Sequence, residues 1–170
     1  MKLCGQMLEE SAQLLHPYPY GYEHYHFDCV AAVYFAKVGD EETSLAHLQR
    51  ATEHADATKD SSLSLIDHML DEAAVTYIEL GRFEDAIKTV SQAIAMCDEL
   101  ENVARYRTAR FDAYLFLGRI CAMNEEYIKA EKAFTEAEKN VRDSPYDWEL
   151  PLCPENIRKM AAKERTARKG

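Results

Sequence analysis

Side chains suited to binding a metal ion are concentrated near the N-terminus, in the segment HPYPYGYEHYHFDC that ends at Cys29. Histidine and cysteine are ligands that transition metals prefer. His24 and His26 are two residues apart and lie on different sides of a helix, whereas His26 and Cys29 share one face. Two donors do not make a site, and the alternative is that His68 and Asp71 complete it from another helix. We predict no metal and no cofactor, and expect the tyrosines of this segment to cover apolar surface.

Residue patterns typical of an active site are missing from the sequence. It contains no Ser, His and Asp series on a recognisable turn, no glycine-rich phosphate loop and no HExxH. Acidic groups such as Asp40 with Glu41 and Glu42, and Glu125 with Glu126, lie where helices are expected to begin, and the helix dipole favours carboxylates there. We predict that the protein is not an enzyme.

Composition and charge limit the partners that we expect. The 170 residues carry a formal net charge of -10, which argues against nucleic-acid binding by the whole chain. No stretch approaches the roughly 20 apolar residues of a membrane span. The five cysteines are scattered, without a CxxC pair, so neither a disulfide framework nor a zinc knuckle is indicated. We expect no membrane partner, a cytoplasmic location and reduced thiols.

The candidate residues must be positioned by helices. Apolar residues recur at intervals of three and four along most of the chain, and no proline occurs between Tyr22 and Val141. The sequence therefore predicts an all-α fold, with Ser61 or Ser62 capping one helix. The expected helices, in antiparallel pairs, are 25–38 with 41–56, 63–80 with 83–99, and 104–123 with 126–141.

One pattern of small and bulky residues occurs three times. A small residue is followed by a bulky one three positions later and by a turn seven positions after the small one. The three sets are Ala32, Phe35 and Gly39; Ala74, Tyr77 and Gly81; and Gly118, Cys121 and Glu125. A small, large, small pattern follows each turn: Ser44, Leu48 and Ala51; Ala86, Val90 and Ala93; and Ala130, Phe134 and Ala137. Antiparallel helices approach closely where a small side chain meets a large one, so each set predicts a packed pair.

This spacing resembles the tetratricopeptide repeat (TPR), which alternates small and aromatic residues over two antiparallel helices of about 34 residues. The resemblance covers roughly residues 25–139. The turns are 42 and 44 residues apart, so these repeats are longer than the standard one, as in bacterial peptide-sensing regulators and some scaffold proteins. The resemblance implies a right-handed superhelix, or α-solenoid, of about three repeats with N- and C-terminal capping helices.

The expected organisation follows from this repeat. We expect an N-terminal helix at 1–16, a Pro/Tyr-rich joint at 17–24, and three repeats within 25–143. The repeats are expected at 25–58, 62–101 and 104–143, followed by a joint at 144–155 and a basic capping helix or tail at 156–170. Gly5, Ala12 and Pro17 match the second half of a repeat, and one interpretation is that the chain is the C-terminal part of a longer protein. The alternative is that residues 2–15 are a simple capping helix.

A curved helical stack implies an inner groove, lined by the first helix of each pair. Helical periodicity assigns nine residues to this groove, and they are the candidate peptide or partner site: His26, Cys29, Val33, His68, Asp71, Val75, Asp112, Leu115 and Arg119. Arg119 is the only cation among them, so we expect it to anchor a ligand carboxylate or carbonyl. The groove lacks the cations with which related repeats clamp the acidic tails of chaperones.

The C-terminal segment has the opposite charge to the rest of the chain. Six basic residues against Glu164 give residues 156–170 a net charge of +5. Capture of nucleic acid or of an acidic partner is one interpretation. We favour a solvated capping helix that docks through Ile157, Met160 and Ala161 on the last repeat.

Two functional hypotheses remain. The first is a non-catalytic interaction module that binds a protein or peptide in the groove. The second is the sensor or dimerisation domain of a helix-turn-helix transcriptional regulator. In the second case nucleic acid would be bound by a missing N-terminal domain, and the chain would form a homodimer.

Overall fold

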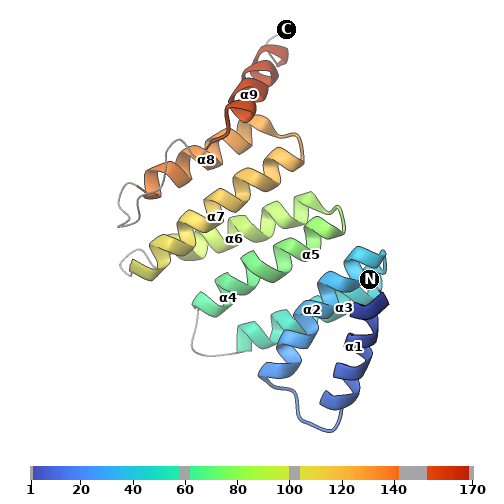
Figure 1. The fold of residues 1–170 in the computed structure, drawn as a ribbon. Helices are drawn as coiled ribbons and strands as arrows, with labels where there is room; N and C mark the ends of the chain where they lie inside the picture. Colours follow the sequence, from blue (N-terminus) through green and yellow to red (C-terminus); the bar gives the residue numbers. More distant parts are fainter. Residues whose placement is uncertain (1, 58–61, 100–103, 142–152, 169–170) are drawn as a thin grey trace. The chain divides into compact units, whose positions relative to one another are not determined.

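The computed structural model describes residues 2–57, 62–99, 104–141 and 153–168. Every regular element within these residues is a helix, which confirms the all-α prediction (Figure 1). The helices are α1 (Lys2–Leu15), α2 (Tyr22–Val38), α3 (Glu41–Ala57), α4 (Ser62–His68), the π-helical turn η1 (Met69–Ala73), α5 (Ala74–Glu79), α6 (Phe83–Glu99), α7 (Ala104–Met123), α8 (Tyr127–Val141) and α9 (Glu155–Ala167). Ser61 and most of the joint expected at 144–155 lie outside the described residues. No helix in the described part of the chain is long and apolar enough to span a membrane.

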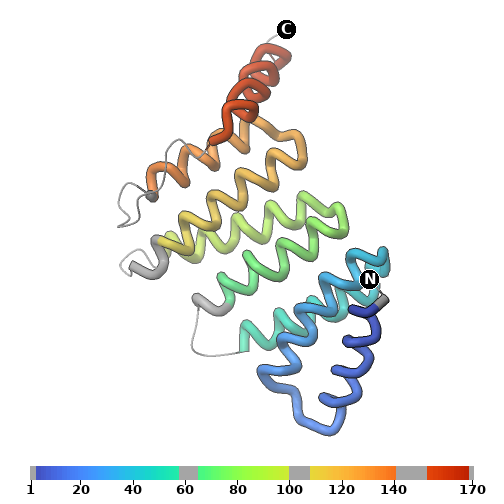
Figure 2. Tube along the Cα trace, in the orientation of Figure 1, coloured from blue at the N-terminus to red at the C-terminus, as the bar shows by residue number. Residues whose placement is uncertain are grey.

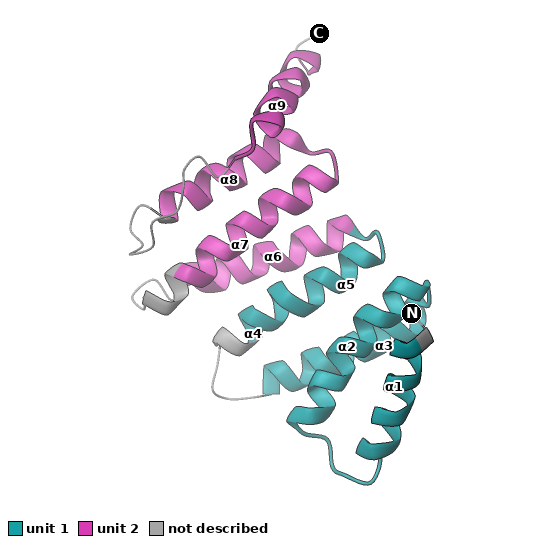
Figure 3. Cartoon of the chain, viewed as in Figure 1, with its two compact units in different colours: residues 1–82 teal, residues 83–170 magenta. Residues whose placement is uncertain are grey.

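The chain divides into two compact units, residues 1–82 and residues 83–170 (Figure 3). In unit 1, α2 packs against α1, α3 and α5. In unit 2, α7 packs against α6 and α8, and α9 packs against α8. The chain trace shows α2 with α3, and α7 with α8, as antiparallel neighbours (Figure 2). Two of the three predicted pairs are thereby confirmed, whereas the pair 63–80 with 83–99 has one helix in each unit and stays a prediction.

The turns at Gly39, Gly81 and Glu125 share one backbone geometry. Their φ angles are 83°, 71° and 59°, and among the described residues these three have left-handed φ. In each turn the amide of this residue donates to the carbonyl three positions back, and the next amide donates to the carbonyl five positions back. This is the Schellman motif, which ends a helix and satisfies its last carbonyls. The predicted turn positions are confirmed, including Glu125, where the sequence lacks the usual glycine.

The small residues of the repeat pattern lie at helix contacts. Ser44 is buried and donates its hydroxyl to the carbonyl of Ala32, 2.7 Å away. A Cβ on Gly118 would lie 2.9 Å from two carbons of the Phe134 ring, so the absence of a side chain lets α7 approach α8. The other small residues of the pattern are also buried: Ala51, Ala74, Ala86, Ala93, Ala130 and Ala137. The predicted packing register is therefore confirmed for the α2–α3 pair and the α7–α8 pair.

A buried carboxylate joins α2 to α3 and to the Pro/Tyr-rich joint. Asp28 accepts hydrogen bonds from the Tyr20 hydroxyl at 2.7 Å, from His47 Nδ1 at 2.6 Å and from the Arg50 guanidinium at 2.8 Å. Burial alone would raise the pKa of Asp28, but these hydrogen bonds outweigh it and hold the pKa below its ordinary value. Asp28 therefore remains a carboxylate in the core of the first helix pair.

Helix α2 begins at Tyr22, three residues before the predicted start, so the expected joint at 17–24 is shorter than predicted. Gly21 is extended, with φ −156° and ψ −162°, and its carbonyl accepts the first helical bond from the Tyr25 amide. The added turn is supported by an edge-on contact between the rings of Tyr22 and His26, whose centroids are 4.2 Å apart. Side chains four positions apart on a helix stabilise it in this way.

The basic C-terminal segment contains α9, which packs on α8. Ile157 and Ala161 are buried, whereas Met160 is exposed and does not join the docking stripe predicted for it. Arg158 and Arg165 pair with Glu138 and Glu131 of α8. The basic residues on this side of α9 thus face carboxylates of their own unit.

Candidate functional site

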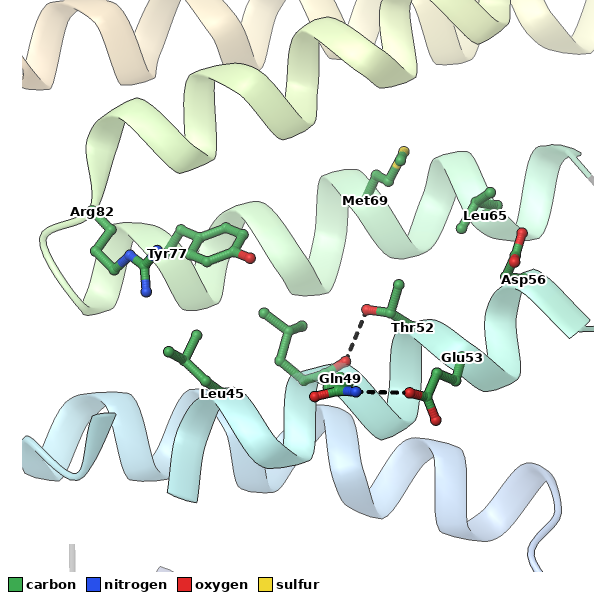
Figure 4. A pocket seen from close by; sticks show the side chains of 10 residues that line it. Leu45, Gln49, Thr52, Glu53, Asp56, Leu65, Met69, Tyr77 and Arg82 are labelled. Atoms are coloured by element: carbon green, nitrogen blue, oxygen red, sulfur yellow. Dashed lines mark hydrogen bonds between the residues drawn. The ribbon is translucent and has the colours of Figure 1, made fainter. Parts of the chain in front are cut away.

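A pocket in unit 1 lies between α3 and the continuous helix formed by α4, η1 and α5 (Figure 4). We call it the α3–α5 pocket, and its volume is about 610 Å³. Its lining residues are Leu45, Leu48, Gln49, Thr52, Glu53, Asp56, Leu65, Met69, Tyr77 and Arg82. Leu48 belongs to a buried cluster with Ala32 and Ala73, and Leu45 and Tyr77 pack against that cluster. The apolar floor is thus continuous with the core, which fixes its shape.

The two ends of the α3–α5 pocket carry opposite charges. Glu53 and Asp56 lie toward the C-terminal end of α3, and Gln49 donates a hydrogen bond to Glu53 at 2.9 Å. Arg82 lies at the other end, beside Tyr77 (Figure 4), and its guanidinium carbon is 5.3 Å from the centroid of the Tyr77 ring. Its Nη1 pairs with Glu41 Oε1 at 3.1 Å. A bound group would therefore meet carboxylates at one end, a guanidinium at the other and apolar surface between them.

The π-helical turn η1 forms part of the pocket wall. It places Met69 in the lining while Leu70 and Ala73 are buried. Partial desolvation raises the pKa of Asp71 and that of the half-buried Glu72, and neighbouring carboxylates raise both pKa values further. A π-helical turn carries one extra residue in the helix, and such insertions are frequent at functional sites.

His68 supports the pocket from behind. Its Nε2 lies 2.9 Å from the Thr52 hydroxyl and its Nδ1 lies 3.3 Å from the Tyr25 hydroxyl. Thr52 donates its own proton to the carbonyl of Leu48, so it accepts from His68 Nε2–H, and Tyr25 donates to Nδ1. Burial lowers the pKa of His68 to about 4, so the ring is neutral at pH 7. One neutral imidazole thus links α2, α3 and α4.

The structure corrects the predicted groove at two positions in unit 1. Cys29 and His68 are each only 1% exposed, so neither side chain is accessible to a ligand. Burial also raises the pKa of the Cys29 thiol to about 12. Both residues lie on the side of their helices that packs against neighbouring helices, a distinction that helical periodicity did not make.

The other predicted groove residues have varied surroundings. In unit 1, His26 and Asp71 are exposed, and Val33 and Val75 are half-buried. In unit 2, Asp112 and Arg119 are exposed, whereas Leu115 is half-buried and packs against Phe111 and Ala137. Their role as a binding groove stays a prediction.

The alternative of a metal site centres on His26. His26 lies near Glu72, and its electrostatic effect on that carboxyl offsets part of the pKa increase that desolvation causes. Among the described residues, no three or more His, Cys, Asp or Glu side chains are arranged to hold a metal ion.

The sequence pattern did not indicate the α3–α5 pocket. The apolar lining residues Leu45, Leu65 and Met69 lie outside the small, large, small register, and these additional apolar positions were the available signal. The charged ends carried no such signal, because exposed charges occur along every helix of the chain.

Comparison with known proteins adds no relative. No family model matches the chain, and neither curated proteins nor solved structures provide a match.

Proposed function

We propose that the chain is a non-catalytic helical-repeat module of TPR type, and that it binds a peptide segment in the α3–α5 pocket. Three helix-ending turns with the same hydrogen-bond pattern, 42 and 44 residues apart, support a repeated helix pair. Helix pairs repeated in this way stack into a right-handed superhelix. Small-angle X-ray scattering from the full chain tests this arrangement, because a superhelix is more elongated than a globular bundle of equal mass.

The observation that carries the binding proposal is the apolar floor with opposite charges at its two ends. From Leu45 to Asp56 the pocket follows eleven residues of α3, or roughly 16 Å at about 1.5 Å per residue. An extended peptide of about five residues has this length. The ligand that fits has an apolar centre, a cationic group near Glu53 and Asp56, and a carboxylate near Arg82. Pockets of this kind bind through the apolar floor and are made specific by a few polar groups.

The binding test uses labelled synthetic peptides with an apolar centre, carrying lysine at one end and a carboxylate at the other, in both orientations. Fluorescence anisotropy is expected to show binding of one orientation. Met69→Arg places a charge on the floor and should weaken binding at least about tenfold, as expected for a buried anchor. The matched control is Met123→Arg, which makes the same change at an exposed methionine of unit 2.

Charge variants test the two ends separately. Glu53→Lys should weaken the binding of a peptide with lysine at that end and strengthen the binding of one with glutamate there. Glu42→Lys, at a residue outside the lining, should change neither affinity. Glu41 competes with a ligand carboxylate for Arg82, so Glu41→Gln should strengthen binding. Equal binding of both orientations, or a Met69→Arg protein that binds like the Met123→Arg control, would contradict the proposal.

A further inference from the structure

Exposed apolar side chains are concentrated at the N-terminal end of the chain. Among the described residues, ten large apolar side chains are exposed, and eight of them lie within residues 3–38. These eight are Leu3, Met7, Leu14, Tyr18, Tyr20, Tyr22, Val30 and Val38. Single exposed apolar residues are ordinary, but a concentration of them marks an interaction surface.

Helix α1 has two apolar sides. One side packs on α2, where a Cβ on Gly5 would lie 2.6 Å from the Tyr34 hydroxyl oxygen. The other side carries Leu3, Met7 and Leu14, which are 69%, 60% and 73% exposed. At 100° per residue these three positions fall within about 40° of one another, so they form a single ridge along the helix. Nothing in unit 1 covers this ridge in the described residues.

A groove lies beside the ridge, between α1 and α2. Its volume is about 370 Å³, and it is lined by Leu8, Ser11, Leu14, Leu15, Glu23, His26, Phe27 and Val30. Leu14 belongs to both the ridge and the groove, so the two are contiguous. Val30, on the far wall, is 60% exposed. We call the ridge and groove together the α1–α2 face.

We propose that the α1–α2 face is a homodimer interface, in which the ridge of each copy lies in the groove of the other. A two-fold rotation requires one patch to complement itself, and a ridge adjoining a groove does so. The ridge has the spacing of an amphipathic helix that docks in an apolar groove. The three ridge side chains are uncharged, which suits two chains that each carry a net charge of -10 and repel elsewhere.

The available area sets the strength of this dimer. Burial of a whole large apolar side chain removes roughly 60–120 Å² of apolar surface from water. The face has four largely exposed apolar side chains and three half-buried ones: Leu3, Met7, Leu14 and Val30, and Leu8, Leu15 and Phe27. Together they supply on the order of 200–350 Å² of apolar surface per copy. A standard interface buries about 800 Å² per partner, of which roughly 450 Å² is apolar. The α1–α2 face is smaller than this, so we expect a weak, reversible dimer.

The test is sedimentation velocity of the full chain from 1 to about 200 µM protein, at low and high salt. The dimer fraction should rise with protein concentration, and also with salt, because salt screens the repulsion between two acidic chains. Leu14→Lys should raise the Kd at least tenfold, and Met7→Lys should do the same. The control Met123→Lys changes an exposed methionine outside the face and should leave the Kd unchanged.

A second measurement locates the interface. Cys4 is exposed on α1, whereas Cys29, Cys97, Cys121 and Cys153 are buried, so a spin label reacts at Cys4 under native conditions. The wild-type dimer should give a distance between labels that disappears in Leu14→Lys, while circular dichroism shows an unchanged fold. A chain that stays monomeric at all concentrations overturns the proposal. A dimer that persists in both lysine variants overturns it too.

Discussion

Gly118 of α7 and Phe134 of α8 are in such close contact that a Cβ at residue 118 would lie 2.9 Å from the aromatic ring. Real Cβ atoms almost never come this close to another heavy atom, so the ring or the helix would have to move. This contact determines how closely α7 and α8 can pack.

Gly118→Ala should therefore destabilise the protein although alanine favours helix. Overpacking costs roughly 1 to 3 kcal/mol, and the gain in helix propensity returns about 1 kcal/mol at most. Urea unfolding should show a net loss, whereas Lys132→Ala on the exposed side of α8 should change the unfolding free energy by less than about 0.5 kcal/mol. The double variant Gly118→Ala/Phe134→Leu should regain part of the loss. A more stable Gly118→Ala protein would show that this contact is not tight.

Glu125 holds the left-handed conformation that Gly39 and Gly81 hold in the other two turns. For a residue with a Cβ, this backbone conformation lowers the stability of the folded state by roughly 1 kcal/mol. Glu125→Gly should therefore raise the unfolding free energy by about 0.5 to 1 kcal/mol, which thermal unfolding measures as an increased Tm. Glu125→Ala keeps the Cβ and removes the carboxylate, so it should give little increase. The reverse change, Gly81→Ala, should cost about 1 kcal/mol from φ alone, because no atom lies within 4 Å of the added Cβ.

The turns and the small residues could be predicted from sequence because each depends on local chemistry. Gly39 and Gly81 have the one residue type that adopts left-handed φ without cost. Ala86 and Ala130 have small side chains, which leave room for a large side chain of a neighbouring helix. Glu125 was found by its position in the repeat and not by its residue type.

Features that depend on tertiary packing could not be predicted in the same way. Cys29 and His68 share the polarity and spacing of groove residues, and only the neighbouring helices show that they are buried. In the sequence, Asp28 cannot be distinguished from a surface carboxylate. Its three partners, Tyr20, His47 and Arg50, are eight to twenty-two residues away and contact it only in the folded structure. The α3–α5 pocket likewise depends on how α3 and α5 pack and not on a motif.

The Asp28 network gives a third prediction. Tyr20→Phe removes one hydrogen bond to the buried carboxylate and should cost about 1 to 3 kcal/mol. Tyr18→Phe, at an exposed tyrosine of the same joint, is the matched control and should cost less than about 0.5 kcal/mol. Chemical unfolding at pH 7 measures both. Equal effects of the two changes would mean that the Tyr20 bond contributes nothing to stability.

His68 gives the last prediction, a loss of stability in mild acid. Its pKa is about 4 in the folded protein and about 6.5 when unfolded, so the unfolded chain binds the extra proton between these values. Protonation of the unfolded state lowers the unfolding free energy, by up to about 1.4 kcal/mol per pH unit for one group. This contribution is fully present above about pH 6.5 and is lost as the pH falls toward 4.

Other groups near His68 change the slope in the opposite sense. Asp71 and Glu72 have raised pKa values in the folded protein, so the folded state takes up their protons first and gains stability as the pH falls. The wild-type curve alone therefore mixes several groups. The difference between the wild-type protein and His68→Gln isolates the histidine, because the glutamine does not titrate and the carboxylates remain.

At pH 7 the wild-type protein should be more stable than His68→Gln by about 1 to 2 kcal/mol, since glutamine does not reproduce both ring hydrogen bonds to Thr52 and Tyr25. This difference should shrink as the pH falls below about 6.5, reach zero between about pH 6 and pH 5, and be reversed at about pH 4.5. Urea unfolding at half-unit pH intervals measures the difference, with His16→Gln as the control for an exposed histidine. A difference that stays constant from pH 7 to pH 4.5 would mean that His68 is protonated as easily in the folded protein as in the unfolded chain. In that case the neutral imidazole linking α2, α3 and α4 would be the wrong description of this contact.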